Sequence, residues 1–145
     1  MEPKPEQAPP EYGPPISLEL AKKVMAAAEA EAAANNWAVA IVIVDSGANP
    51  VMLHKLDQTQ LSSMDLAQAK AETAVSYKCP TKLWQDLLAS GGEELRLITM
   101  KSIIALEGGI PLIIDGKIIG AIGVSGVFPM QDSQVAAAGA DALAG

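Results

Sequence analysis

The feature that most constrains the fold of this chain is a tight hairpin centred on Asp115-Gly116. Apolar residues flank the pair on both sides, in the segments Pro111–Ile114 and Ile118–Val124. An Asp-Gly pair tolerates the positive φ angles that both central positions of a type I′ turn require. The sequence therefore predicts two antiparallel strands joined at Asp115-Gly116.

A glycine-rich bend begins within the second of these strands, continues into the loop after it, and leads through Pro129 into a short alanine-rich helix. Missing side chains let another backbone or a ligand come unusually close. One interpretation is close packing of the sheet against a helix or a subunit. The other is a cradle for an anion or carboxylate, formed by the backbone amides of Val124–Val127 and the N-terminus of the helix. The small residues of the bend are Gly120, Gly123, Ser125 and Gly126.

Length and charge exclude several classes of protein. With 145 residues, half of them apolar, the chain can bury one continuous core, so we expect a single domain over residues 16–145. Its 10 basic and 17 acidic residues give a net charge of −7, which would repel nucleic acid. The apolar runs are shorter than the about 20 residues that a membrane helix needs. We therefore expect a soluble protein without a membrane span.

The first 15 residues form a leader that holds six of the ten prolines. Such a composition buries little apolar surface, so we expect the leader to be extended or disordered. If the chain is complete, a cytoplasmic location is expected; a leader left after removal of a signal peptide would instead indicate a periplasmic or secreted protein. The single cysteine, Cys79, excludes an intrachain disulfide and a cysteine-rich zinc site, and no spacing of ligands indicates another metal.

Periodicity predicts the remaining elements, which describe an α+β domain with an antiparallel sheet covered by helices. Strands are indicated by β-branched or alternating residues, and helices by apolar residues at helical spacing between capping and breaking residues. We expect a helix from Leu18, capped by Ser17 and ended by Asn35-Asn36; strands at Ala38–Val44 and Val51–Leu56; a helix from Ser62 or Ser63 to Lys78; a helical segment at Thr81–Ala89; an ambiguous stretch at Glu93–Leu106; and a last helix from about Ser133 to Leu143, capped by Asp132.

Lys70 falls in the middle of the apolar side of the helix predicted before Pro80. Burying an ammonium group is costly unless an acid or an anionic ligand pairs with it, or the amine reaches the surface. Asp45 and Asp57, at the ends of the first two strands, are the acids expected near it. A snorkelling lysine, an internal ion pair and a contact to a ligand all remain open.

Short motifs spread over residues 16–144 carry a resemblance to a known family. They are Val44–Gly47, Asp57, Ala69–Ala74, Pro80-Thr81, Gly108–Pro111, Asp115-Gly116, Ile119–Gly126 and Gln131-Asp132. In these motifs the chain resembles the GlcG/HbpS family, which is also found as the C-terminal domain of PduO-type proteins. The resemblance implies a five-stranded antiparallel sheet flanked by helices, profilin-like in architecture, and a homo-oligomer between a dimer and an octamer.

The resemblance also implies a small-molecule ligand, since some members of the family bind or degrade haem and others bind corrinoid-related partners. For haem, the residues that could bind the iron are His54, the only imidazole, and Cys79, which precedes a proline as in some haem sensors. The other residues expected to contact a ligand are Lys70, Asp45, Asp57, Thr73, Tyr77, Gly123, Ser125, Gly126 and Asp132.

Three functions are compatible with these patterns. The first is an oligomeric protein that binds haem, another tetrapyrrole or a different small ligand in sensing, storage or sequestration. The second is an enzyme of small-molecule catabolism that holds an anionic substrate between Lys70 and the glycine-rich bend, although no catalytic residues can be assigned. The third is a non-catalytic assembly partner, whose alanine- and glycine-rich faces pack identical subunits.

Overall fold

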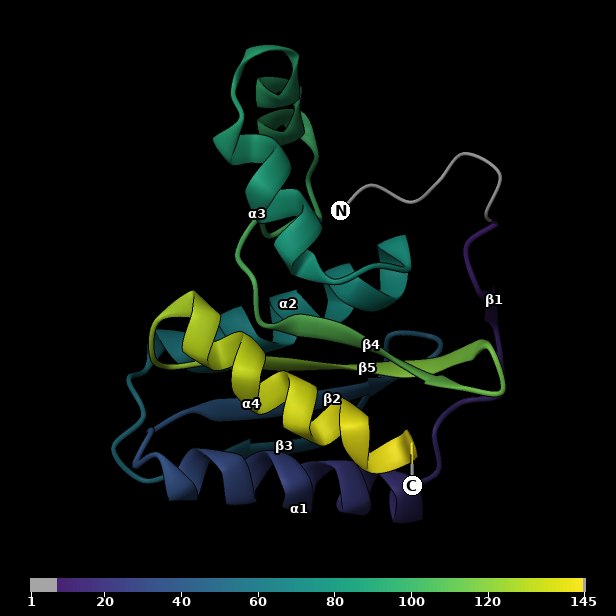
Figure 1. Ribbon diagram of the computed structural model, residues 1–145, viewed down its shortest axis with the longest axis vertical. Helices are drawn as coiled ribbons and strands as arrows, with labels where there is room; N and C mark the ends of the chain where they lie inside the picture. The colour runs from purple at the N-terminus through teal and green to yellow at the C-terminus, as the bar shows by residue number, and fades with distance from the viewer. Residues whose placement is uncertain (1–7, 145) are drawn as a thin grey trace.

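The computed structural model describes residues 8–144, which form a five-stranded sheet with helices on both faces (Figure 1). Residues 1–7 of the predicted leader, with Pro3 and Pro5, lie outside the described residues. The elements in chain order are β1 Glu11–Tyr12, α1 Leu18–Ala34, β2 Ala40–Asp45, β3 Pro50–Lys55, α2 Ser62–Tyr77, α3 Thr81–Ala89, the 3₁₀ helix η1 Gly92–Thr99, β4 Gly109–Ile114, β5 Lys117–Ser125, α4 Pro129–Asp141 and the 3₁₀ turn η2 Ala142–Ala144.

Strand β5 is the centre of the sheet and pairs with three other strands. It lies antiparallel to β4 on one side and to β2 on the other, and β3 follows β2, also antiparallel. Strand β1 pairs with the start of β5 in the parallel direction, so the sheet is mixed rather than wholly antiparallel. Because β2 ends at Asp45, opposite Gly120, the start of β5 is left free and Glu11-Tyr12 fills that position. These two residues of the predicted leader are therefore part of the sheet.

The predicted turn between β4 and β5 is confirmed. Asp115 has φ of 52° and Gly116 has φ of 76°, which are the two positive angles of a type I′ turn. Ile114 pairs with Lys117 directly across the turn. The hairpin sets the register of β4 against the central strand, and it thereby brings the glycines at the start of β4 beside the end of β5.

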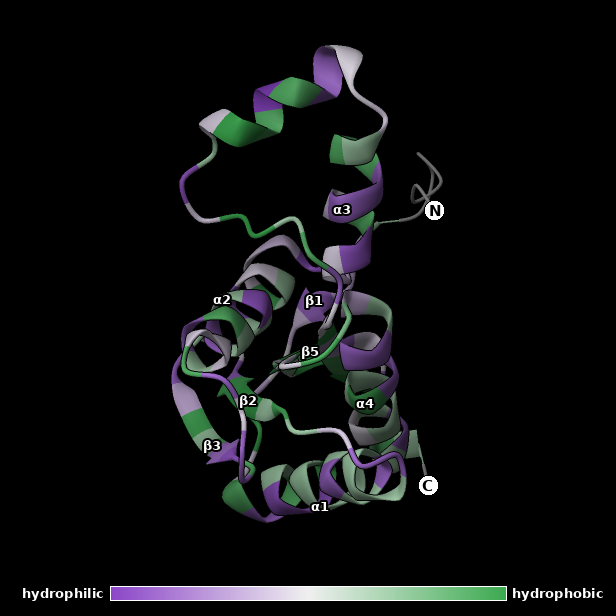
Figure 2. Cartoon of the chain, turned by 90° about the vertical axis from the view of Figure 1, so that its left-hand side faces the viewer, coloured by the Kyte–Doolittle hydropathy of each residue, from purple (hydrophilic) through white to green (hydrophobic). Residues whose placement is uncertain are grey.

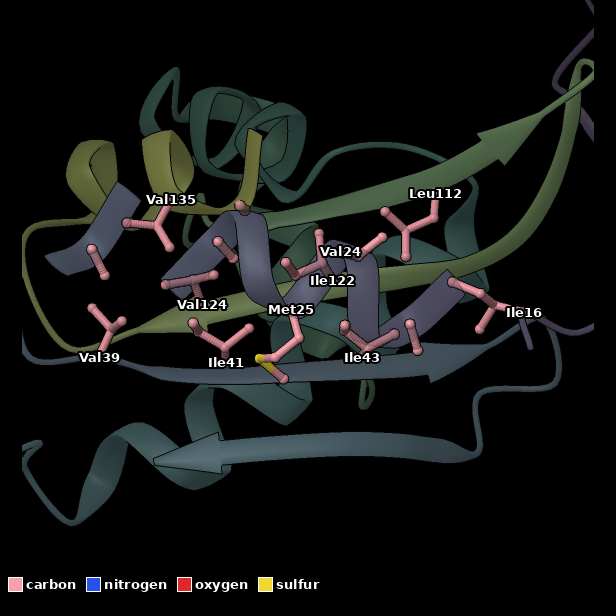
Figure 3. Packing of buried hydrophobic residues seen from close by; sticks show 14 of the residues in the cluster. Ile16, Val24, Met25, Val39, Ile41, Ile43, Leu112, Ile122, Val124 and Val135 are labelled. Atoms are coloured by element: carbon pink, nitrogen blue, oxygen red, sulfur yellow. The ribbon is translucent and has the colours of Figure 1, made fainter. Parts of the chain in front are cut away.

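Side chains on the two faces of the sheet fill two separate hydrophobic clusters. Helices α1 and α4 cover one face, where β2 contributes Ile41 and Ile43 (Figure 3). Helix α2 covers the other face, where β2 contributes Val42 and Val44. Strand β2 is thus apolar on both faces, because successive side chains of a strand point to opposite sides.

The helix ends follow from their capping residues. The hydroxyl of Ser17 accepts a hydrogen bond from Leu20 N at 3.1 Å, as expected for the N-cap of α1. Helix α4 begins at Pro129, four residues before the predicted Ser133, because proline suits the first helical position, where its missing N–H is not needed. Among residues 8–144, no helix has both the length and the hydrophobicity to cross a membrane.

Helix α3 and η1 form an arm that projects from the sheet and its covering helices (Figures 1 and 2). Gly91 and Gly92, both with positive φ, make the turn between them. The stretch that was ambiguous in sequence is η1 followed by an irregular segment that returns to β4. Along η1, Ile98 is 75% exposed and Leu95 is 53% exposed, so the arm presents apolar side chains to solvent.

Candidate functional site

Lys70 lies in the middle of α2 and is buried against the end of β5. Its side chain is only 1% exposed, which agrees with its position on the apolar side of the predicted helix. The ammonium group donates to the carbonyl oxygen of Val124 at 2.9 Å and to Oδ2 of Asp132 at 3.0 Å. The charge is therefore held inside the protein by a carbonyl and a carboxylate.

Asp132 joins this lysine to the glycine-rich bend. It belongs to the first turn of α4, and its Oδ1 accepts a hydrogen bond from Val127 N at 3.1 Å. Because α4 begins at Pro129, the carboxylate reaches back over the residues that precede the helix. One side chain thus fixes the bend, the start of α4 and the middle of α2 to one another.

Close packing encloses the Lys70 amine and the adjoining strand. A Cβ atom on Gly108 would lie 2.8 Å from Nζ of Lys70 and 2.7 Å from the oxygen of Val124. A Cβ atom on Gly123 would lie 2.0 Å from the carbonyl oxygen of Ala67 in α2. At Gly123 these contacts favour the interpretation of close packing of helix on sheet.

Burial dominates the electrostatics of the pair. Desolvation lowers the pKa of Lys70, and the charges of Asp132 and Glu107 oppose this effect. Desolvation raises the pKa of Asp132, and the charge of Lys70 and the backbone N–H groups of Val127 and Gly126 oppose it. The carboxylate of Asp132 thus favours the charged form of Lys70, whose burial is otherwise costly.

Asp45 and Asp57 do not pair with Lys70, so the expected partners were wrong. Oδ1 of Asp45 accepts from Gly47 N at 2.9 Å and from Asn49 N at 3.0 Å, which closes the turn between β2 and β3. Asp57 is exposed. The true partner is 62 residues from Lys70 in sequence and is brought to it by the packing of α4 against the end of β5.

Other predicted residues lie around this pair or at the end of α2. Ser125 is buried beside the bend, next to Gly126. Thr73, one turn after Lys70, is also buried, and its hydroxyl donates to Ala69 O at 2.7 Å. Tyr77 packs edge-to-face against Trp84, with ring centroids 5.3 Å apart. The structure thus brings Lys70, Gly123, Ser125, Gly126 and Asp132 together and places Tyr77 at the junction with α3.

Two polar residues that were not among the expected ligand contacts, Glu107 and Thr81, support the start of β4. Glu107 is buried, and its backbone N–H donates to Oε1 of Gln85 at 2.9 Å. Thr81 accepts from Gly109 N at 2.9 Å. The sequence did contain a sign of the contact between Thr81 and Gly109, because Pro80-Thr81 and Gly108-Gly109 are both among the motifs that resemble the family.

His54 lies on β3, on the side of the sheet covered by α1. Its side chain is 45% exposed, and its Nδ1 contacts the carboxylate of Glu29 in α1. Within residues 8–144, Nε2 makes no hydrogen bond. The imidazole therefore offers one ring nitrogen to a ligand from solvent while a carboxylate holds the other.

Cys79 is half-buried at the junction of α2 and α3. Burial raises the pKa of its thiol, and the neighbouring Trp84 side chain opposes this effect more weakly. The raised pKa favours the neutral thiol at this position. The thiolate, which is the form that binds ferric iron and reacts with electrophiles, is correspondingly disfavoured. Among the described residues, no three side chains of His, Cys, Asp or Glu gather to form a metal site.

We expect Cys79 to react with a disulfide reagent such as DTNB more slowly than N-acetylcysteine does at the same slightly alkaline pH. The reason is that burial disfavours the thiolate and limits access to it. The reaction can be followed by absorbance, with the protein unfolded in guanidinium chloride as the control, in which the rate should approach that of the free thiol. A folded rate equal to that of N-acetylcysteine would contradict this description of the site.

These features define a compact α+β protein whose buried ion pair braces a glycine-rich bend. The sequence pattern of the family described as haem degrading protein HbpS-like matches residues 16–141. The GlcG protein of Escherichia coli K12 is 37% identical over 110 residues, which cover 76% of this chain and 81% of GlcG. The chain therefore belongs to the HbpS-like family.

Solved structures of relatives have the same fold. A double mutant of HbpS from Streptomyces reticuli superimposes with a TM-score of 0.82 at 30% identity, covering 99% of this chain and 94% of that one. The complex of PduOC with haem superimposes with a TM-score of 0.79 at 27% identity, covering 88% of this chain and 94% of that one. Relatives of this chain thus include haem-binding proteins.

Proposed function

We propose that this protein binds haem or a related tetrapyrrole and acts in its storage, sequestration or sensing. The observation that carries the proposal is the similarity to PduOC in complex with haem, which extends over 88% of this chain. The HbpS-like family description, which names haem as well, supports the same ligand. The enclosed Lys70 amine takes no direct part in this proposal, because its hydrogen bonds are made within the protein.

The chemistry of the described residues favours His54 as the ligand to the iron. A histidine that binds a metal through one nitrogen usually donates a hydrogen bond from the other nitrogen to a carboxylate, which orients the ring and increases its basicity. Glu29 occupies this position at Nδ1, and the His54 side chain is 45% exposed. Cys79 is less suited to this role, since burial raises the pKa of its thiol.

The proposal includes self-association, between a dimer and an octamer. Several large apolar side chains are exposed on the projecting arm and at the end of the sheet where α2 and α4 begin, and contact with identical subunits would remove them from water. The most exposed of them are Leu61 at 86%, Phe128 at 76%, Ile98 at 75% and Met130 at 72%.

Titration of the protein with haemin tests the proposal, and we expect a saturable shift of the Soret band. His54→Ala should weaken haemin binding by at least about tenfold, and Glu29→Gln should weaken it less, because an outer carboxylate tunes a ligand that remains in place. Cys79→Ser is the control and should bind like the unmodified chain. No saturable shift with the unmodified protein would overturn the haem proposal, whereas full binding by His54→Ala would overturn only the choice of ligand residue.

A further inference from the structure

A groove lies beside α2, on the face of that helix next to the irregular segment that follows η1. Its volume is about 430 Å³, within the range of small-molecule sites. Helix α2 contributes Ala69, Glu72, Thr73 and Ser76, which share one face at helical spacing, and residues 101–104 form the opposite wall. The two walls come from parts of the chain that are separated by the whole projecting arm.

Thr73 connects the two walls of the groove. The Thr73 hydroxyl oxygen accepts from the N–H of Ile104 at 3.2 Å. It also lies 3.2 Å from the carbonyl oxygen of Ser102, which competes with the nearer carbonyl of Ala69, at 2.7 Å, for the single hydroxyl proton. The threonine is only 1% exposed, so its hydroxyl serves the protein rather than a ligand. These contacts attach the segment after η1 to α2, so both walls of the groove are in place without a ligand.

Two opposite charges line the groove without pairing. Glu72 on α2 and Lys101 on the facing segment both border it, and neither makes an ion pair or a side-chain hydrogen bond within residues 8–144. The hydroxyls of Ser76 and Ser102 also border the groove and make no side-chain hydrogen bond there. The polar groups that face this space are thus available to a ligand.

From this arrangement we infer that the groove binds a small zwitterion, a molecule that carries an ammonium group and a carboxylate joined by a short carbon chain. Lys101 pairs with the carboxylate and Glu72 with the ammonium, while Ala69, Ile103 and Ile104 contact the carbon chain. Glu72 would repel a simple anion and Lys101 would repel a simple cation. The two charges therefore favour a ligand that carries both an ammonium group and a carboxylate.

This site is separate from the proposed haem ligand. His54 lies on the side of the sheet covered by α1, whereas the groove adjoins α2, which covers the other side. The inference therefore does not depend on haem binding, and the haemin titration and the zwitterion test can fail independently.

The test is titration of the ¹⁵N-labelled protein with glycine, 4-aminobutyrate and 6-aminohexanoate, which differ in the separation of their charges. At least one of them is expected to shift the amide resonances of Ala69 and residues 101–104 in a saturable manner. Butyrate and butylamine, which carry one charge each, should bind about tenfold more weakly or not at all. Glu72→Gln and Lys101→Gln should each weaken binding of the best zwitterion by about tenfold, because each removes one charge-assisted contact.

Matched control variants are Glu93→Gln and Lys22→Gln, which change exposed charges of the same types outside the groove. Both should bind the zwitterion like the unmodified chain. The inference is overturned if none of the three zwitterions shifts the groove resonances. It is also overturned if butyrate or butylamine binds as well as the zwitterions do, or if Glu72→Gln and Lys101→Gln bind as well as the controls.

Discussion

Asp132→Ala is expected to lower the free energy of unfolding by about 3 to 5 kcal/mol, as found when one partner of a buried ion pair is removed. The substitution would leave the ammonium of Lys70, which is 1% exposed, with the Val124 carbonyl as its remaining hydrogen-bond acceptor. It would also remove the acceptor for the N–H of Val127. Urea unfolding followed by circular dichroism measures the change.

Asp141→Ala is the matched control, because it removes an exposed aspartate from the other end of α4. Its free energy of unfolding should stay within about 0.5 kcal/mol of the original, as for most surface substitutions. Should Asp132→Ala be as stable as Asp141→Ala, Lys70 would have to find another partner or reach solvent. The description of the pair as a brace between α2 and α4 would then be incorrect.

Gly123→Val is expected to cost about 3 kcal/mol or more, at or above the upper end of the usual cost of overpacking. Even the Cβ atom would lie 2.0 Å from the carbonyl oxygen of Ala67 and 2.6 Å from the backbone nitrogen of Ala71. These are backbone atoms of α2, so relief requires the whole helix to move away from β5. We expect a large drop in the urea midpoint, or insoluble protein on expression.

Gly47→Ala serves as the control for this effect. Gly47 lies in the exposed turn after β2, and a Cβ atom there would approach the side-chain amide of Asn49 at 3.1 Å, which can rotate away. Its cost should be below about 1 kcal/mol. A Gly123→Val protein as stable as Gly47→Ala would show that α2 does not pack directly on the central strand.

Local signals in the sequence were sufficient for most of the architecture. The Asp115-Gly116 turn was predictable because few residue pairs accept two positive φ angles, and the first helix because Ser17 and Asn35 mark its ends. The position of Lys70 on the apolar side of its helix could also be predicted, although an amine that reaches the surface remained an alternative to a buried one.

The parts that could not be predicted depend on contacts between distant segments. Asp132 could not be chosen over Asp45 as the partner of Lys70, because that choice depends on where α4 meets the end of β5. The pairing of β1 with β5 was missed, since two residues next to a proline-rich segment show no strand periodicity. The groove at Glu72 was missed as well, because its other wall is an irregular segment without a pattern.

We propose that the pair of Lys70 and Asp132 stabilises the fold and that haem binds away from it. The most direct test is haemin titration of the double variant Lys70→Met, Asp132→Asn, in which both charges are removed and an amide oxygen can still accept from Val127 N. Since replacing both members of a buried pair is much less costly than removing one, this variant should fold. We predict a saturable Soret shift with the same affinity as the unmodified protein. A folded double variant that no longer binds haemin would contradict the claim and place the ligand at the pair.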